Sequence, residues 1–437
     1  HQAVSTNAES LLPAPLRSAF DGRTGSLLRL LELNGEPRGS TISMDVMGDD
    51  PLGDWWRAYL HGVRPMPVTS SETTIRTAEL FCGPGGLAQG AKQACRELGH
   101  GFLSRFAIDS DAAAVNVYGL NHGTEYPSSQ SVTMLVDYRV KGRREEARMV
   151  YAPEVTDDRL GEMTGELDLL LAGPPCQGHS NLNNHTRRDD DRNELYLTVP
   201  ALAIAAKIPM VVIENVTAVV HDSSGVVETA KKLFDDAGYD MTDGVLKADR
   251  LGWPQTRGRY FLVARLREYG PPIPLEEVAA SLADKPRNVM WAIEDLIGAE
   301  TDDEMNRRPE LGPDNIRRID WLFDNDEYDL ALDQRPDCHK DGTTYGAVYG
   351  RMHPDKPAPT LTTGFLTPGR GRYVHPTERR VLTPREAARL QGFPDTYRWR
   401  LPGRPPPTSS LLAKWIGDAV PMPLGHAATL SVLGPGF

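Results

Sequence analysis

The stretch that decides the fold is "DLLLAGPPCQGHS", residues 168 to 180. Its apolar part is typical of a buried strand, and two prolines follow directly after it. Proline fixes its own backbone and donates no hydrogen bond, so Pro174 and Pro175 end the strand and hold Cys176 in an extended loop. The pattern predicts a thiol that is presented at a strand end and is not packed in the core.

Apolar and helical segments alternate on both sides of this stretch. Strands are predicted in "TIRTAELF", "FLSRFAID", "LDLLLAG" and "PMVVIENV", and helices in "GGLAQGAKQACRELG" and "SDAAAVNVYGLN". This alternation is typical of a doubly wound α/β fold, a mostly parallel sheet with helices on both faces. Ligands bind beyond the carboxyl ends of such strands, where Gly83, Asp109, Cys176 and Glu214 fall.

The pattern divides the 437 residues into four parts. Residues 1–73 carry no motif and form an N-terminal extension of unknown role, whose Trp55, Trp56 and Tyr59 could dock on a neighbour. Residues 74–265 form the predicted catalytic domain. Residues 266–379 lack strand and helix alternation and are interpreted as a smaller inserted domain, and residues 380–437 return to the first domain.

The return to the first domain is predicted to begin with a helix in "TPREAARLQGF". Thr383 is suited to the N-cap and Pro384 to the first helical position. Glu386, three residues after the cap, completes the pattern of a capping box.

Composition limits the class of protein. The chain is 40% hydrophobic and 25% charged, with no apolar run of membrane-spanning length and no secretory signal, which predicts a cytoplasmic protein without membrane association. The four cysteines show no Cys-x-x-Cys pair, so neither a metal site nor a disulfide framework is expected. The net charge of −12 confines any nucleic-acid contact to a local basic patch.

The segment "ELFCGPGGLAQG" places Gly83, Gly85 and Gly86 between a strand and a helix, where backbone can approach a ligand closely. The next strand ends at Asp109, whose carboxylate is placed to accept hydrogen bonds from a ribose diol. Together they indicate an adenosine-containing cofactor. The alternatives are a tight turn without a ligand and a helix N-cap at Asp109, a role that Ser110 or Asp111 could fill equally well.

Two further residues carry chemistry. Cys176 is the candidate nucleophile, because backbone N–H groups near a loop-to-helix transition stabilise a thiolate. Glu214 ends the buried strand "VVIEN", where desolvation should raise the pKa of its carboxyl group and suit it to proton transfer. The alternatives are a structural cysteine and a salt-bridged structural glutamate.

Six segments, in order and at roughly the family spacing, resemble the motifs of the C5 cytosine DNA methyltransferases. They are "ELFCGPGGLAQG", "AGPPCQGHS", "IENV", "GWPQTRGRYFLVA", "LTPREAARLQGFP" and "KWIGDAVP". The resemblance spans residues 75 to about 425. It implies the S-adenosylmethionine-dependent methyltransferase fold, an inserted target-recognition domain, and methyl transfer to carbon 5 of a cytosine flipped out of duplex DNA.

The resemblance also implies roles for individual residues. The Cys176 thiolate would add to carbon 6 of cytosine, Glu214 would hold the base and supply a proton, and Arg259 would contact the base edge with Arg257 in support. No metal is implied. The residues implied to hold S-adenosylmethionine are Phe81, Gly83, Gly85, Gly86, Leu87, Asp109, Ser110, Pro174, Asp418 and Ala419.

Two positions depart from the family pattern. Ser110 stands where many members have a bulky residue that packs on adenine. Asp418 replaces the usual asparagine, and a carboxylate there is expected to weaken cofactor binding or to alter its pH dependence.

DNA contacts are expected in two places. The segment after the nucleophile resembles the family's mobile catalytic loop, and its candidate contacts are Ser180, Arg187, Arg188 and Arg192; the alternative is a solvated charged loop. Residues 300–330 carry a net charge of −7, and residues 335–380 carry +4, so the second segment is the better DNA-facing candidate. Its Arg370 and Arg372 are predicted phosphate contacts, unless they pair with acids of the first segment.

The interpretation is a monomeric bacterial enzyme, associated with the nucleoid, that methylates double-stranded DNA in restriction-modification or phage defence, with possible partner proteins of that system. An RNA cytosine methyltransferase and a non-catalytic DNA-binding homologue are the alternatives. A nicotinamide dehydrogenase could share the glycine-rich turn and Asp109, but it would not explain Pro-Cys-Gln or Glu-Asn-Val.

Overall fold

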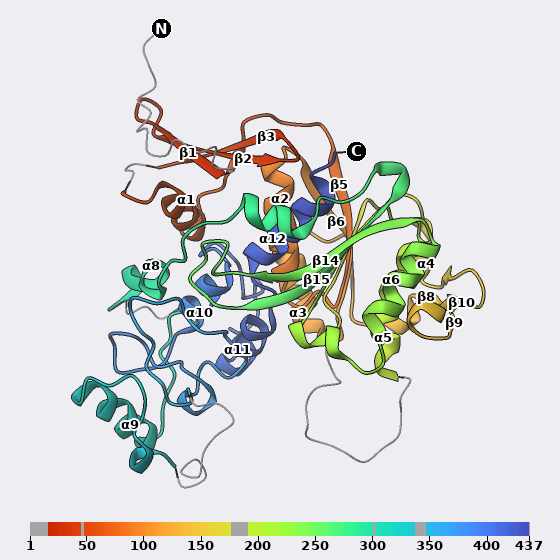
Figure 1. The fold of residues 1–437 in the computed structure, drawn as a ribbon. Coiled ribbons are helices and arrows are strands. Elements are labelled where there is room, and N and C mark those ends of the chain that lie inside the picture. The colour runs from red at the N-terminus through yellow and green to blue at the C-terminus, as the bar shows by residue number, and fades with distance from the viewer. Residues whose placement is uncertain (1–15, 45–47, 176–190, 300–302, 337–346, 437) are drawn as a thin grey trace.

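A seven-stranded sheet forms the centre of the computed structural model, which describes residues 16–44, 48–175, 191–299, 303–336 and 347–436 (Figure 1). The strands lie in the order β14 (Tyr239–Lys247), β15 (Gly258–Leu266), β13 (Met210–Asn215), β12 (Leu169–Ala172), β5 (Thr74–Leu80), β6 (Gly101–Ile108) and β7 (Tyr126–Ser128). β15 is antiparallel to both of its neighbours, and the pairings from β13 to β7 are all parallel. The predicted doubly wound, mostly parallel sheet is confirmed.

Helices cover both faces of this sheet, as the two-residue alternation of β12 shows. Leu169 and Leu171 join the core beneath α2 (Gly86–Glu97) and α12 (Met422–Leu433). Leu170 and Ala172 join the core beneath α5 (Asp191–Ala205) and α6 (Val226–Asp236). Successive side chains of a strand point to opposite faces, so an uninterrupted apolar run is the pattern expected of a strand buried on both sides.

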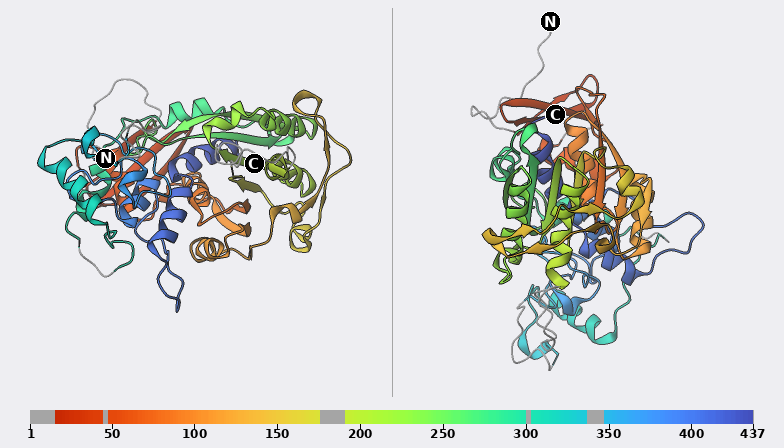
Figure 2. Two further views of the ribbon diagram at one scale, coloured as in Figure 1. Left: turned by 90° about the horizontal axis from the view of Figure 1, so that it is seen from below. Right: turned by 90° about the vertical axis from the view of Figure 1, so that its right-hand side faces the viewer.

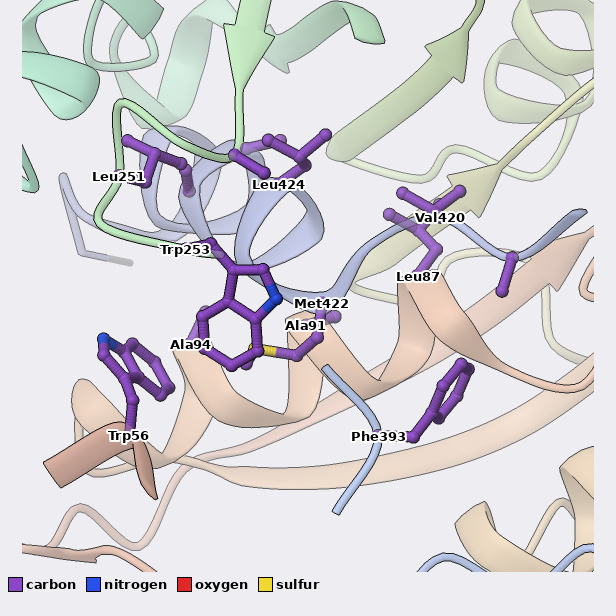
Figure 3. Close-up of a cluster of buried hydrophobic side chains, with 14 of the residues drawn as sticks. Trp56, Leu87, Ala91, Ala94, Leu251, Trp253, Phe393, Val420, Met422 and Leu424 are labelled. Carbon is purple, nitrogen blue, oxygen red and sulfur yellow. The ribbon is translucent and has the colours of Figure 1, made fainter. Parts of the chain in front are cut away.

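The glycine-rich loop is followed by a helix that is buried along its length. α2 packs against α12. The two helices approach closely at Gly90, where an added Cβ would lie only 2.5 Å from the backbone nitrogen of His426. Figure 3 shows Trp253 and Met422 beside Ala91 and Ala94 of α2. This packing fixes where α2 begins, and therefore where its first backbone N–H groups lie.

The N-terminal part forms its own antiparallel sheet, which the sequence pattern did not reveal. The strands are β1 (Leu16–Asp21), β2 (Ser26–Leu33), β3 (Glu36–Ser43) and β4 (Met66–Pro67). The helix α1 (Pro51–Leu60) follows β3 and buries Trp55, Trp56 and Tyr59, which confirms the predicted docking. The rings of Trp56 and Trp253 meet edge to face at 5.6 Å, so this part shares the core of the catalytic sheet.

The chain after β15 first stays with the catalytic sheet. α7 (Leu275–Ser281) packs against α12 and β14. A separate small core of Ile319, Leu322, Leu330 and Val374 then forms around α9 (Pro313–Asp324). The right-hand view of Figure 2 shows this region and the N-terminal sheet at opposite ends of the molecule, with the seven-stranded sheet between them. The boundaries 266 and 379 stay predictions.

The helix predicted in "TPREAARLQGF" is α10 (Pro384–Gln391), and its predicted capping box is confirmed. Thr383 Oγ1 accepts from the Glu386 backbone nitrogen at 3.3 Å, and Glu386 Oε2 accepts from the Thr383 backbone nitrogen at 2.8 Å. Among the described residues, no helix is long and apolar enough to cross a membrane.

The remaining elements are shorter or peripheral. They are α3 (Ala112–His122), β8 (Val136–Asp137), β9 (Val140–Lys141), β10 (Arg148–Met149), β11 (Glu154–Val155), α4 (Asp158–Glu162), α8 (Val289–Ile293) and α11 (Ser409–Asp418).

Candidate active site

A cavity of about 440 Å³ lies at the carboxyl ends of β5, β6, β12 and β13, with α11 and the residues after it as a further wall. Nine of the ten predicted cofactor positions line it, and Gly85 does not. Glu214, Arg257 and Arg259 line the same cavity, so the predicted cofactor and base-binding residues share one space.

The glycine-rich loop has a backbone that only glycine adopts easily at two of its positions. Gly83 has φ 49° and Gly85 has φ 102°. A Cβ on Gly85 would lie 2.4 Å from His122 Nε2, whereas a Cβ on Gly83 would meet nothing within 4 Å. Phe81 also has a positive φ of 56°, an uncommon conformation for a side chain of this size. The loop is therefore held tightly from behind and is open on the side of Gly83.

Asp109 holds this loop in place. Its Oδ2 accepts a hydrogen bond from the Gly83 backbone nitrogen at 2.9 Å, and its Oδ1 accepts one from the Asp111 backbone nitrogen at 2.9 Å. Asp111 is the N-cap of α3, where its side chain accepts from the backbone nitrogens of Ala113 and Ala114. The capping alternative for Asp109 is thus wrong. Its carboxylate links the loop after β5 to the start of α3, through the backbone nitrogens of Gly83 and Asp111.

Glu79 is a site residue that the sequence analysis missed. It is the penultimate residue of β5, is 1% exposed and lines the cavity. Its Oε2 is buried without a hydrogen-bond partner among the described residues. Burial raises its pKa to about 8, although hydrogen bonds from Tyr118 and from the Ala88 backbone lower it, and the charge of Asp109 raises it further. The available signal was an acidic residue inside an apolar strand, directly before the glycine-rich loop.

Glu214 and Arg259 form a buried ion pair. Arg259 Nε lies 3.0 Å from Glu214 Oε1, and Glu214 is 8% exposed. Burial raises the pKa of Glu214, although Arg259 and Arg257 act in the opposite direction. The structure therefore contains both the predicted proton-transfer environment and the salt bridge of the structural alternative, and a buried acid paired on one oxygen is consistent with either.

Arg257 and Asn215 fix the walls beside this pair. Arg257 is 3% exposed and donates to the carbonyls of Leu361 and Gly417, and burial lowers its pKa to about 9. Asn215 Nδ2 donates to the Pro174 carbonyl at 3.3 Å. These bonds link residues of the cavity wall to partners that are distant in the sequence.

Asp418 lies at the cavity with a cation beside it. Lys414 Nζ is 3.7 Å from an Asp418 carboxylate oxygen and 3.6 Å from Asp111 Oδ2. Trp415 Nε1 also donates to Asp111 Oδ2, at 3.1 Å. The unusual carboxylate is therefore partly balanced by a lysine of the same helix.

The structure does not describe every predicted site residue. Cys176, Ser180, Arg187 and Arg188 lie outside the described residues, as does the side chain of Arg192. The described chain reaches the cavity wall at Pro174 and Pro175. No group of three or more His, Cys, Asp or Glu that could hold a metal occurs in the described ranges.

The two arginines of the basic segment differ. Arg372 pairs with Asp329 at 2.5 Å and donates to the carbonyls of Tyr328 and Arg351. Arg379 likewise pairs with Asp320 and Asp324, so the acidic segment neutralises much of the basic one. For Arg372 the pairing alternative is the one the structure supports. Arg370 is exposed and makes no side-chain hydrogen bond or ion pair with the described residues.

The strand order with one antiparallel strand, together with a glycine-rich loop held by the carboxylate that follows the next strand, agrees with the predicted fold of the S-adenosylmethionine-dependent methyltransferases. The chain belongs to the C-5 cytosine-specific DNA methylase family, whose model matches residues 75–433. It is a DNA (cytosine-5) methyltransferase.

Comparison with known proteins agrees with this assignment. The chain is 38% identical over 372 residues to the type II methyltransferase M1.BsuMI of Bacillus subtilis, a match that covers 85% of this chain and 83% of that protein. It is 28% identical to the type II methylase M.HgiDII of Herpetosiphon aurantiacus, over 81% of this chain and 94% of that protein. The fold resembles a crystal structure of a DNA modification methyltransferase encoded within an Escherichia coli prophage, with TM-score 0.55, 21% identity, and coverage of 83% and 99%.

Proposed function

We infer that the cavity binds S-adenosylmethionine, with the methionine end at Glu79 and the ribose at Asp109. Three observations support this placement. Glu79 has a buried, unpartnered carboxylate oxygen, which the cofactor's ammonium group would satisfy. Each Asp109 oxygen makes one backbone hydrogen bond and retains capacity to accept from a ribose hydroxyl. The open position at Gly83 lets the cofactor approach the loop backbone.

The observation that carries the base-binding role is the Glu214–Arg259 pair in the same cavity. Arg259 occupies Oε1 of Glu214 and thereby orients the carboxyl group, while burial favours its protonated form. A protonated Glu214 donates to the ring nitrogen N3 of cytosine and withdraws electrons from the ring. This makes carbon 6 a better acceptor for the Cys176 thiolate.

Methyl transfer proceeds by addition to the base, methylation and elimination. The Cys176 sulfur bonds to carbon 6, and carbon 5 becomes electron-rich. When bound, S-adenosylmethionine would supply the methyl group to carbon 5, and its sulfonium sulfur would leave as the thioether of S-adenosylhomocysteine. Loss of the carbon 5 proton to a base and departure of the Cys176 thiolate restore the aromatic ring. The target base must leave the duplex to reach a site at the end of a sheet.

The substrate is duplex DNA, and the physiological setting is restriction-modification in the bacterial cytoplasm. Both named relatives are type II enzymes, and the family model is that of a DNA methylase, which disfavours an RNA substrate. Duplex contacts come from Ser180, Arg187, Arg188, Arg192 and the exposed Arg370. The enzyme acts as a monomer.

The test is expression in a methylation-free bacterial host, followed by base-resolution mapping of 5-methylcytosine in the host genome. The proposal predicts complete methylation at one short recognition sequence, and no methylation with Cys176→Ala. Purified enzyme should transfer methyl groups to duplexes that contain that sequence and not to folded RNA. Methylation of RNA alone would contradict the assignment.

A further inference from the structure

A second cavity, of about 240 Å³, lies along α2 beside Gln89, Lys92 and Arg96. Its walls come from the chain after α1, from α2, from the end of α3 and from the chain after α10. The charged side chains that line it are Arg64, Lys92 and Arg96, and no carboxylate of the described residues lines it. Three cations therefore share a small space in a protein whose net charge is −12.

These cations have few partners. Lys92 Nζ donates to the Asn121 carbonyl at 3.1 Å. Arg64 and Arg96 make no side-chain hydrogen bond or ion pair with the described residues, although many other arginines of the protein pair with carboxylates. Burial lowers the pKa of Lys92 to about 8 and that of Arg96 to about 10, and in both cases the neighbouring cations add to the effect. The fold thus keeps like charges together at a cost in stability.

The placement of Lys92 and Arg96 follows from the helix. They stand four residues apart on α2, so their side chains are neighbours, and like charges at this spacing destabilise an isolated helix. The packing of Ala91, Ala94 and Cys95 into the core fixes the rotation of α2. Nothing in the core requires a charge at either position.

Polar groups complete the cavity floor. Gln89 Nε2 donates to the Tyr59 hydroxyl at 2.7 Å, and that hydroxyl donates to the Gly392 carbonyl at 3.0 Å. The Tyr397 hydroxyl donates to the Pro84 carbonyl and lies 3.1 Å from His122 Nε2. Because Pro84 lines the cofactor cavity, Tyr397 connects this carbonyl of the glycine-rich loop to the second cavity.

We propose that Arg64, Lys92 and Arg96 form a binding site for a small phosphate-bearing anion. Arginine and lysine are the side chains that bind phosphate oxygens, and a cleft lined by one sign of charge concentrates counter-ions. The volume accommodates a diphosphate or a small organic phosphate. The inference is independent of the catalytic assignment, because it uses none of the residues of the active site.

The position of the cations separates this site from the DNA-facing side. α2 begins at the cofactor cavity, and Arg96 stands ten residues after Gly86. A rise of 1.5 Å per residue places its backbone roughly 15 Å further along the helix axis. A backbone phosphate of DNA bound over the carboxyl ends of the strands is therefore the less suitable occupant.

Isothermal titration of the full chain with inorganic pyrophosphate, at constant ionic strength set with sodium chloride, tests the site. The wild type should bind pyrophosphate, and Arg96→Met and Lys92→Met should each bind about tenfold more weakly or worse, the loss of one charge-assisted contact. Arg148→Met, which removes an exposed arginine elsewhere, should bind as the wild type does. No binding by the wild type, or equal binding by all variants, would overturn the proposal.

Two further measurements test whether Arg96 stabilises the fold or contacts DNA instead. In phosphate-free buffer, Arg96→Met should unfold at the same or a higher urea concentration than the wild type, because it removes like-charge repulsion. A lower midpoint would assign Arg96 a structural role and overturn the proposal. The salt dependence of duplex binding should be the same for Arg96→Met and the wild type. A shallower salt dependence would place the cations on the DNA path and overturn the small-anion assignment.

Discussion

Replacing Glu79 by glutamine should change how the stability of the cofactor-free protein depends on pH. In the folded protein its pKa is about 8, against an ordinary value of 4.5, mainly because the carboxyl group is buried. Between these two pH values the unfolded chain releases a proton that the folded protein retains. The stabilisation is fully present below about pH 4.5 and is lost as the pH rises through 8.

The size of the effect follows from the difference in pKa. Each pH unit between the two values lowers the free energy of unfolding by roughly 1.4 kcal/mol, so the complete loss of stability is about 5 kcal/mol. Between pH 5 and pH 8 it amounts to about 4 kcal/mol. This is a large share of the free energy of unfolding of a typical domain, which is about 5–15 kcal/mol. Glutamine does not ionise, so Glu79→Gln removes this dependence.

Urea unfolding of the wild type and Glu79→Gln at pH 5, 6, 7, 8 and 9 measures the effect. The difference between the two free energies of unfolding cancels the titration of all other groups. It should shift by about 4 kcal/mol in favour of the variant from pH 5 to pH 8 and then level off. A difference that does not vary with pH would refute the assignment of a buried, protonated Glu79.

The same residue links stability to the cofactor. The ammonium group of S-adenosylmethionine would favour the ionised carboxylate, so binding near pH 7 should release about one proton from the wild type and none from Glu79→Gln. Calorimetry in buffers of different ionisation enthalpy measures that proton. Equal proton release by both proteins would place the ammonium group elsewhere.

The remaining predictions concern the other site residues. Glu214→Gln should slow methyl transfer about 10²- to 10⁴-fold and leave cofactor affinity unchanged in calorimetry, whereas an equal loss of cofactor affinity would contradict its role on the base. Asp109→Ala should weaken S-adenosylmethionine binding, because the Gly83 and Asp111 backbone nitrogens lose their acceptor; unchanged affinity would exclude it from the cofactor site. Arg370→Ala should reduce the slope of log K against log salt for duplex binding by about 0.9. Arg372→Ala should instead lower stability in urea unfolding, because the carbonyls of Tyr328 and Arg351 lose their donor.

Local patterns predicted much of the fold. The strands and helices around the active site follow from the apolar alternation, and the capping box at Thr383 follows from residues that lie within one turn of each other in the sequence. The N-terminal sheet was missed because Arg29 and Ser40, both buried in its strands, interrupt the apolar pattern. A local sequence pattern identifies a helix or strand only when its apolar residues are the buried ones and its polar residues are the exposed ones.

Roles that depend on distant partners could not be predicted in the same way. The residue type at Asp109 indicated a ligand, but its bonds to the loop and the capping of α3 by Asp111 emerge only once the two crossovers meet. Arg372 contributes to a basic segment in the sequence, yet its partner Asp329 lies 43 residues earlier. Glu79 was overlooked because an acid inside an apolar strand is only a weak signal until the cavity beside it is known.

The measurement that most directly tests the central claim is covalent trapping with a duplex that carries 5-fluorocytosine at the mapped target position. Fluorine cannot leave carbon 5 as a proton does, so the methylated intermediate should remain bonded to the enzyme. With S-adenosylmethionine present, mass spectrometry should find the nucleotide on the peptide that contains Cys176, and Cys176→Ala should form no adduct while still binding the cofactor. An adduct on another residue, or methyl transfer by Cys176→Ala at a rate near that of the wild type, would contradict the mechanism.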